Sequence, residues 1–392
     1  MRAGSVKGAR TFIRAAGAAL ALCCVMVLAV GLPMQVKVLT PRLGMPAIAQ
    51  PGSVIQVRLA GSLPLILPDF ELELEGRGGV SQLQVKGTQW RGFETLVTLT
   101  LPELPDGAYA LRLKTRDQAL VMPKAVFVRK NWSDPLRVAH IADLPAPGHE
   151  ALMRQFIAQM QQRQPDAVLV SGDINYGGSQ QNIDFMFAEL ARLDMPVILT
   201  AGNHEREGWH RYLRVFGARN HRTSLGPITV ISLDSGHGRD ALTPDAMRWL
   251  RRELVDAGGR TTLIQIHHPL FPPGSSANPE AGGTGGYLRG GRNEFLELCE
   301  QFRVTMVLGG RRNIKTEIDD TGASRSDGED FPGTKYVVTT TLGADTRAVF
   351  AGQPPVSGYR WIVFTNGQLT SYAQITDNPL QGTATVAPAV QP

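Results

Sequence analysis

Short apolar runs recur along the middle of this chain, and several of them end in side chains that can bind a metal ion or a phosphate. The runs are followed by Asp143-Leu144-Pro145, by Gly172-Asp173-Ile174-Asn175-Tyr176, by Gly202-Asn203-His204-Glu205 and by His267. Runs of this length, bounded by turns and alternating with amphipathic segments, are typical of buried strands in an α/β sheet. Because ligands gather beyond the carboxyl ends of parallel strands, we expect these side chains to meet at one site.

The second part of the chain, residues 135–375, is predicted to be an α/β domain. Hydrophobic periodicity predicts helices over residues 150–162, 182–193, 244–255 and 293–302. Strands are predicted over residues 138–142, 167–170, 196–199, 228–233, 262–266 and 304–308, and further β segments over 336–341, 359–364 and 369–372. This alternation indicates a core of parallel strands with β additions.

Residues 35–130 show a different pattern, in which short strands follow one another without helices. The strands predicted over residues 54–59, 70–74, 96–101 and 109–113 alternate apolar with polar side chains. Turns rich in Gly and Pro separate them, which is typical of an immunoglobulin- or fibronectin-like β-sandwich. No cluster of titratable groups stands out here, so we interpret this part as a scaffold, a linker or a binding module.

The N-terminal residues 1–33 have the pattern of a targeting segment. Basic residues up to Arg14 precede an apolar run without charges, residues 15–32, which indicates a secretory signal peptide or an N-terminal membrane anchor. We therefore expect an exported protein that is periplasmic, extracellular or membrane-anchored and faces outward. Part of the net charge of +5 belongs to this leader and no long basic run follows, so a nucleic-acid partner is unsupported. The tail 377–392 is predicted to be disordered.

The side chains at the predicted strand ends have the chemistry of a metal centre. Asp143 and Asp173 supply anionic oxygens, and Asp173 can bridge two cations because paired metals lie only about 3.5–4 Å apart. Tyr176 can add a phenolate, Asn203 an amide oxygen and His267 an imidazole nitrogen. Mixed oxygen and nitrogen ligands favour iron, zinc or manganese over magnesium alone.

Three further residues have alternative interpretations. His204, next to Asn203, can contact a substrate phosphoryl oxygen or protonate a leaving group. His237 lies in a loop, where it is either solvated or a substitute metal ligand. Cys299 is the one cysteine beyond the leader and falls on the apolar face of a predicted helix, so we interpret it as a core residue.

These motifs resemble the calcineurin-like metallophosphoesterase superfamily and, within it, the purple acid phosphatases. The resemblance covers about residues 136–372 and rests on the GDxxY form at 172–176, the GNHE at 202–205 and His267 in a His-x-Pro context. It implies a four-layer α/β/β/α sandwich preceded by a β-sandwich. It also implies hydrolysis of phosphoric esters by a metal-activated water, and therefore a phosphorylated small molecule or macromolecule as partner.

The resemblance also implies a ligand set for a pair of iron, zinc or manganese ions. One metal would be held by Asp143, Asp173 and Tyr176, and the second by Asp173, Asn203 and His267. His204 would be the catalytic residue that assists the leaving group.

The last motif of the family departs from its expected form. A GHxH sequence is expected after the strand 304–308, and its two histidines fall on Gly310 and Arg312. Arg312 can pair with Asp143 and Asp173 in place of a metal, or Arg311 and Arg312 can clamp a substrate phosphate. Pro145 is a second departure.

Two functions therefore stay open at the level of the sequence. The chain is either a metallophosphoesterase, with full or reduced activity and with one metal or two, or a catalytically dead module without a metal. In the second case it would bind a phosphorylated ligand or a protein partner.

Overall fold

The computed structural model of the protein describes residues 36–61, 70–92, 94–145, 147–174, 179–235, 241–271, 287–311, 316–342 and 357–376. The predicted leader, the predicted tail and three candidate site residues lie outside these ranges: Tyr176, His237 and Arg312. Within the ranges, no helix has the length and apolar character needed to cross a bilayer.

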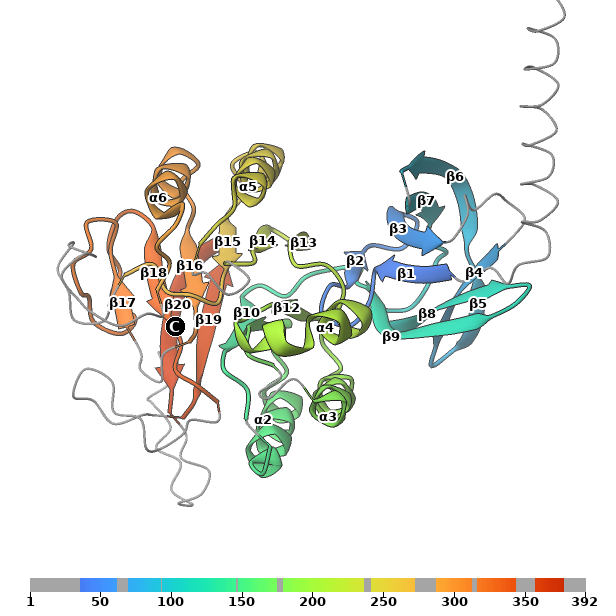
Figure 1. The fold of residues 1–392 in the computed structure, drawn as a ribbon, viewed down its shortest axis with the longest axis horizontal. Coiled ribbons are helices and arrows are strands. Elements are labelled where there is room, and N and C mark those ends of the chain that lie inside the picture. The colour runs from blue at the N-terminus through green and yellow to red at the C-terminus, as the bar shows by residue number, and fades with distance from the viewer. Residues whose placement is uncertain are drawn as a thin grey trace, which may run out of the picture.

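Two β-sheets form the first part of the molecule, seen in blue and teal in Figure 1. In order across the first sheet, the strands are β1 (Val36–Thr40), β3 (Val54–Gly61), β7 (Glu94–Thr100) and β6 (Gln84–Arg91). In order across the second, they are β2 (Ala47–Ala49), β9 (Ala119–Val128), β8 (Gly107–Thr115), β4 (Phe70–Gly76) and β5 (Gly79–Gln82). Alternate side chains of both sheets enter one buried cluster, which includes Val57, Leu99 and Leu111.

Two further sheets form the second part, one of five strands and one of six. The five-stranded sheet has the order β12 (Val197–Thr200), β11 (Ala167–Ser171), β10 (Leu136–Ile141), β19 (Tyr359–Thr365) and β20 (Gln368–Ile375). The six-stranded sheet has the order β13 (His221–Leu225), β14 (Ile228–Ser232), β15 (Thr262–Gln265), β16 (Met306–Gly309), β18 (Lys335–Val338) and β17 (Thr316–Ile318). Strands β10 to β12 run parallel, as do β14, β15, β16 and β18, so their carboxyl ends share an edge in each sheet.

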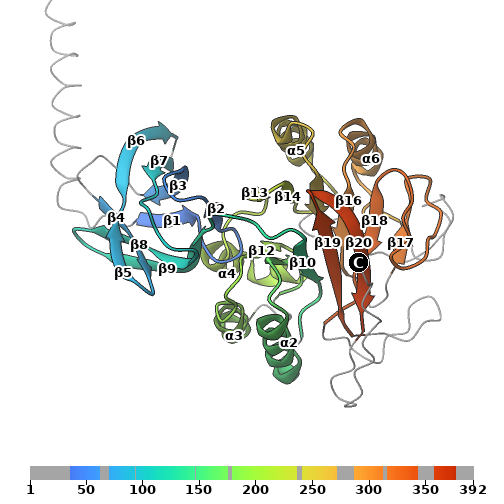
Figure 2. The same cartoon turned by 180° about the vertical axis from the view of Figure 1, so that it is seen from behind.

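Helices cover the outer faces of the two sheets, as Figures 1 and 2 show. The five-stranded sheet packs against α2 (Glu150–Arg163), α3 (Gln180–Leu190) and α4 (Trp209–Val215), and the six-stranded sheet against α5 (Pro244–Ala257) and α6 (Arg292–Gln301). A short 3₁₀ helix, η1 (His204–Gly208), precedes α4. Two helix starts carry the expected caps, because Ser179 accepts from the backbone of α3 and Thr243 from that of α5.

A third buried cluster lies between the two sheets. Strand β11 is buried at every position, and its first four residues are apolar. Val168 and Val170 pack toward the helices, whereas Leu169 packs between the sheets. Leu169 meets Leu263 and Met306 of the other sheet there. Strands buried on both faces lose the polar alternation that marks half-exposed strands.

The segment from Arg42 to Met45, between β1 and β2, contacts the second part of the molecule. Gly44 bridges to Ile198 at the outer edge of β12, and its carbonyl accepts from Leu199 N at 2.8 Å. The guanidinium of Arg42 donates to the carbonyls of Val38 and Arg214. The backbone of this segment therefore adds to the edge of the five-stranded sheet.

The predicted mixed α/β core is confirmed, with parallel strands at its centre. Each of the four predicted helices is present, with bounds that differ by at most a few residues. Strand β6 was not predicted, because it is exposed on both faces and its sequence does not alternate. The domain boundaries near residues 130 and 135 stay predictions.

Candidate metal centre

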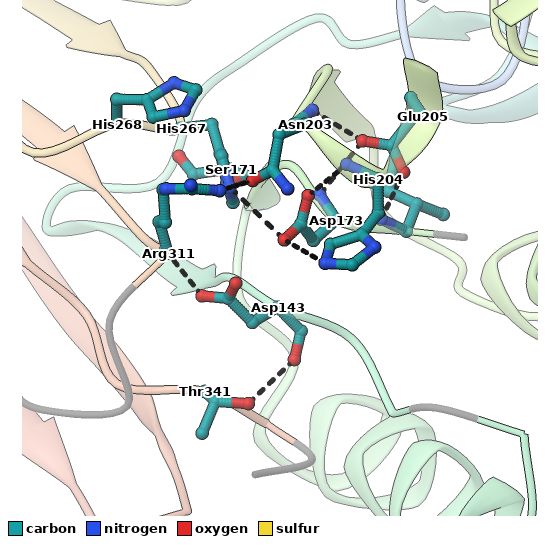
Figure 3. Close-up of polar contacts among 12 residues, drawn as sticks. Asp143, Ser171, Asp173, Asn203, His204, Glu205, His267, His268, Arg311 and Thr341 are labelled. Atoms are coloured by element: carbon teal, nitrogen blue, oxygen red, sulfur yellow. Dashed lines mark hydrogen bonds and ion pairs between the residues drawn. The ribbon is translucent and has the colours of Figure 1, made fainter. Parts of the chain in front are cut away.

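The predicted site residues within the described ranges lie at the carboxyl ends of strands from both sheets (Figure 3). Asp143 follows β10 and Asp173 follows β11. Asn203 lies between β12 and η1, and His267 follows β15. We call these four residues the acceptor cluster. The prediction that they meet at one edge of the fold agrees with the structure.

Tight packing brings three of the four loops of the cluster together. A Cβ on Gly172 would lie 2.7 Å from Gly202 Cα and from His267 Nδ1, so position 172 has no room for a side chain. Gly172 also has a φ of 80°, in the left-handed region that favours glycine. Asp143 and Asp173 have φ values of 50° and 52°, a conformation that Asp tolerates better than most residues.

Glu205 fixes the loop that carries Asp173. Its buried carboxylate accepts hydrogen bonds from the backbone N–H groups of Asp173 at 3.0 Å, Ile174 at 2.7 Å and Gly202 at 2.5 Å. In addition, His204 N donates to Asp173 Oδ1 at 3.0 Å. The carboxylate of Asp173 is thus oriented by main-chain groups, and its Oδ2 faces the cluster (Figure 3).

The hydrogen bonds of His267 fix which of its nitrogens faces the cluster. Nδ1 lies 2.9 Å from the carbonyl oxygen of Ser171, and because a carbonyl only accepts, Nδ1 carries a proton. Nε2 then faces Asn203 Oδ1 at 2.9 Å and Asp173 Oδ2 at 3.3 Å. Two oxygen acceptors therefore surround a nitrogen that can bind either a proton or a metal ion.

The charges of the cluster perturb one another strongly in the metal-free protein. Burial, opposed by His267 and reinforced by Asp173, raises the pKa of Asp143 to about 7. Burial alone would also raise the pKa of Asp173, but the charge and hydrogen bond of His267 outweigh it and hold that pKa well below its usual range. Burial would lower the pKa of His267, but Asp173 and Asp143 raise it to about 9. In the metal-free protein, His267 therefore carries a positive charge at neutral pH, and Asp173 carries a negative charge beside it.

The donor set fits a metal ion. One ligand atom each from Asp143, Asp173 and His267 lies within 4.8 Å of the others, and all three residues are buried. Asn203 adds an amide oxygen beside His267. Two carboxylates, an imidazole and an amide suit zinc, manganese or iron. Tyr176, the further ligand that the family resemblance implies, lies outside the described residues, so its part stays a prediction.

Arg311 contacts the acceptor cluster directly. Its backbone N–H donates to Asp143 Oδ2 at 2.7 Å, and its guanidinium donates to Asn203 Oδ1. Figure 3 shows the side chain reaching across from Asp143 toward Asn203. The predicted role of Arg311 in binding a substrate phosphate remains a prediction, as does that of Arg312, which lies outside the described residues.

Sequence reasoning missed the residues that hold the ligands in place. Glu205 was quoted only as part of a motif, although a carboxylate next to two glycine-containing loops can accept several backbone N–H groups. His140 is a buried residue of β10, and its ring nitrogens lie 2.6 Å from Thr339 Oγ1 and 2.7 Å from Ser171 Oγ. Burial and the charge of Arg360 lower its pKa to about 3, so the ring is neutral.

Comparisons with known proteins agree with this geometry. Residues 136–310 match the family described as calcineurin-like phosphoesterase. The glycerophosphodiester phosphodiesterase GpdQ of Enterobacter lignolyticus is 32% identical over 164 residues, which cover 38% of this chain and 57% of that protein. A probable glycerophosphodiester phosphodiesterase GpdQ of Arcobacter nitrofigilis is 29% identical over 208 residues, which cover 49% of this chain and 71% of that protein. The chain thus spans little more than half of the first relative.

A solved structure shares the fold. The purple acid phosphatase PPD1 from yellow lupin (Lupinus luteus) seeds superposes with a TM-score of 0.55 at 16% identity, over 84% of this chain and 73% of that chain. At this identity the likeness concerns the fold alone. The predicted resemblance is confirmed by the family match and the relatives together, and residues 136–310 of this chain are similar to the calcineurin-like phosphoesterases.

Proposed function

We propose that this chain is a metal-dependent hydrolase of phosphoric diesters. The observation that carries the proposal is the buried group of Asp143, Asp173 and His267, whose ligand atoms lie within 4.8 Å of one another. The family match supports phosphoric ester hydrolysis as the reaction. Both relatives named above are described as phosphodiesterases, which supports diesters as the substrate class.

The residues of the site have two roles, metal binding and proton transfer. A metal ion held by Asp143, Asp173, Asn203 and His267 would polarise a phosphoryl oxygen and lower the pKa of a water molecule. His204 lies at the exposed side of the cluster, with Nε2 3.9 Å from Asp173 Oδ2 and a side chain that is 36% exposed. It can reach a substrate that enters from solvent and donate a proton to the leaving oxygen.

We also propose a four-layer architecture for the second part of the chain, a sandwich of immunoglobulin type for the first part, and export of the protein. The packing of helices on the outer faces of two sheets supports a four-layer α/β/β/α sandwich. The two N-terminal sheets around one core support a sandwich of immunoglobulin type. Export is supported by the sequence of residues 1–33, and fractionation of cells that produce the full chain tests it.

A hydrolysis assay tests the proposed reaction. The purified full-length chain is incubated with Mn²⁺, Zn²⁺ or Fe²⁺ and with either bis(4-nitrophenyl) phosphate or 4-nitrophenyl phosphate. We expect the diester to be hydrolysed faster than the monoester, and the rate to vanish with a chelator or with Asp143→Asn. As a control, Asp117→Asn removes a carboxylate paired with Arg116 in the first part of the chain and leaves the rate unchanged. A metal-loaded chain that hydrolyses neither ester would contradict the proposal.

A second function is favoured by one observation, the contact between Arg311 and Asn203. A guanidinium bound to a potential metal ligand is the arrangement expected of a module that binds its partner without catalysis. In that case the protein retains no metal after dialysis against metal-free buffer, and the Asp143→Asn variant binds a phosphorylated ligand as the unmodified chain does. Retained metal together with hydrolysis rules out this alternative.

A further inference from the structure

At Gly310 the backbone itself packs against one side of the acceptor cluster, and there is no room for a side chain. A Cβ on Gly310 would collide with the Cβ of Ala142 and lie 3.1 Å from Asp143 Oδ2 and from the carbonyl oxygen of Ser171. The backbone is fixed there, because Gly310 N donates to the carbonyl of His267 at 3.0 Å. No side chain can therefore enter the site from position 310 unless the backbone shifts.

Arg311 occupies the space beside Gly310. It is tied to Asp143 through its backbone and to Asn203 through its guanidinium. Its φ of 65° is in the left-handed region, where a residue other than Gly, Asn or Asp persists only if its surroundings hold it. Arg311 Nε is buried without a hydrogen-bond partner among the described residues. Arg311 is half-buried, and its guanidinium contacts Asn203 within the site.

Besides the guanidinium of Arg311, one metal ion can be bound next to His267. Its Nε2 faces Asn203 Oδ1 and Asp173 Oδ2, whereas its Nδ1 is committed to the carbonyl of Ser171. The amide oxygen of Asn203 has two lone pairs, so it can accept from Arg311 with one and face a metal ion with the other. The donors within the described residues therefore suffice for one ion.

We propose that this centre is built for one metal ion and one arginine, with the guanidinium of Arg311 in the place of a second ion. The inference rests on the proposed function only in that it concerns the same site. Charge favours this arrangement. One divalent ion and one guanidinium already exceed the charge of the two carboxylates, Asp143 and Asp173. A second ion would leave a large uncompensated positive charge in a buried site.

Metal stoichiometry is the first test. The full-length chain is loaded with Mn²⁺ or Zn²⁺ and desalted, and the bound metal is measured by elemental analysis and by titration calorimetry. We expect about one ion per chain. About two ions, or none, would overturn the proposal. One ion without hydrolysis would overturn only the proposed function, whereas two ions with hydrolysis would overturn only this inference.

Substitution of Arg311 is the second test. Removal of the guanidinium charge in Arg311→Met should tighten Mn²⁺ binding at least about tenfold, because two cations a few ångströms apart repel each other. Arg311→Lys keeps the charge and should bind Mn²⁺ within about threefold of the unmodified chain. Arg58→Met, which removes an arginine paired with Glu94 far from the cluster, is the matched control. Equal or weaker binding by Arg311→Met would overturn the proposal, and the stoichiometry of the unmodified chain decides it independently if that variant misfolds.

Discussion

The two sides of the acceptor cluster are built by different means. On the Asp173 side, neutral backbone N–H groups and the carboxylate of Glu205 position the loop, and the ligand atoms of Asp173 and His267 face the site. On the other side, one residue does the positioning: Arg311 donates its neutral backbone N–H to Asp143 and its cationic guanidinium to Asn203.

The difference matters for what each side can bind. A carboxylate held by neutral dipoles keeps its negative charge available to a cation. An acceptor held by a guanidinium has already satisfied part of its demand for positive charge. The comparison therefore predicts that changes on the Asp173 side cost metal binding, whereas changes at Arg311 and Gly310 alter packing and the number of ions.

The largest effect is expected from Asp173→Asn. This change removes the carboxylate that faces both His267 and His204, and an amide of the same shape keeps the packing. We expect metal affinity to fall by at least about 100-fold, more than the loss of a supporting partner usually costs. Calorimetry measures the affinity, and an unchanged circular dichroism spectrum of the metal-free variant shows that the fold is intact. Metal binding that survives the change would show that the Asp173 side is not the primary site.

The next effect is expected from Glu205→Gln. Three backbone N–H groups point at this buried carboxylate, and an amide offers only one accepting oxygen and turns two donors toward them. We expect a loss of about 3 kcal/mol in the free energy of unfolding, measured by denaturant titration. Glu103→Gln, in the first part of the chain, is the control. A loss below about 1 kcal/mol would mean that the Asp173 loop is held by packing instead.

A comparable effect is expected from pH in the metal-free protein. The pKa of His267 is raised to about 9 from its ordinary 6.5, so the stability it contributes is complete below pH 6.5 and is lost as the pH rises through 9. We expect the free energy of unfolding to fall by up to about 3 kcal/mol across this window. Melting temperatures between pH 6.5 and 9 in the presence of a chelator measure this loss.

Adding metal tests whether His267 causes this pH dependence. Saturating Mn²⁺ competes with the proton for His267, so the fall in melting temperature with pH should shrink or disappear. His267→Gln should show a smaller fall without metal. A fall of the same size in that variant would assign the pH dependence to other groups.

The smallest effect is expected from Gly310→Ala. The added methyl group would collide with Ala142, and we expect a loss of about 1–2 kcal/mol in the free energy of unfolding. Gly78→Ala is the matched control, because a Cβ there meets nothing within 4 Å. If the Gly310→Ala variant is as stable as the control, the backbone next to Arg311 can shift, and this side of the cluster is less rigid than its contacts suggest.

The convergence of the ligands could be predicted from the sequence, whereas the identity of the nearby arginine could not. Asp143, Asp173 and His267 meet because parallel strands end at a shared edge, and apolar runs reveal such strands. That Arg311 contacts the cluster depends on how closely Gly310 approaches Ala142, and motif spacing does not report such packing between distant segments.

The strands of the first part also show what the sequence pattern can and cannot predict. Strands β3, β4, β7 and β8 were predicted because they alternate with period two. Strand β6 has exposed side chains on both faces, so its pairing with β7 has no counterpart in the hydrophobic pattern. The proposed role of His204 also depends on its exposure at the rim, which the motif alone does not specify.

The bridge between Gly44 and Ile198 has a consequence for how the protein behaves in a crowded solution. Strand β12 is the outermost strand of its sheet, and the backbone of the Arg42–Met45 segment covers it. An uncovered outer strand is a template for pairing with other chains. The Arg42–Met45 segment therefore shields this edge from other chains, and we expect a shortened chain that begins after Met45 to self-associate through β12.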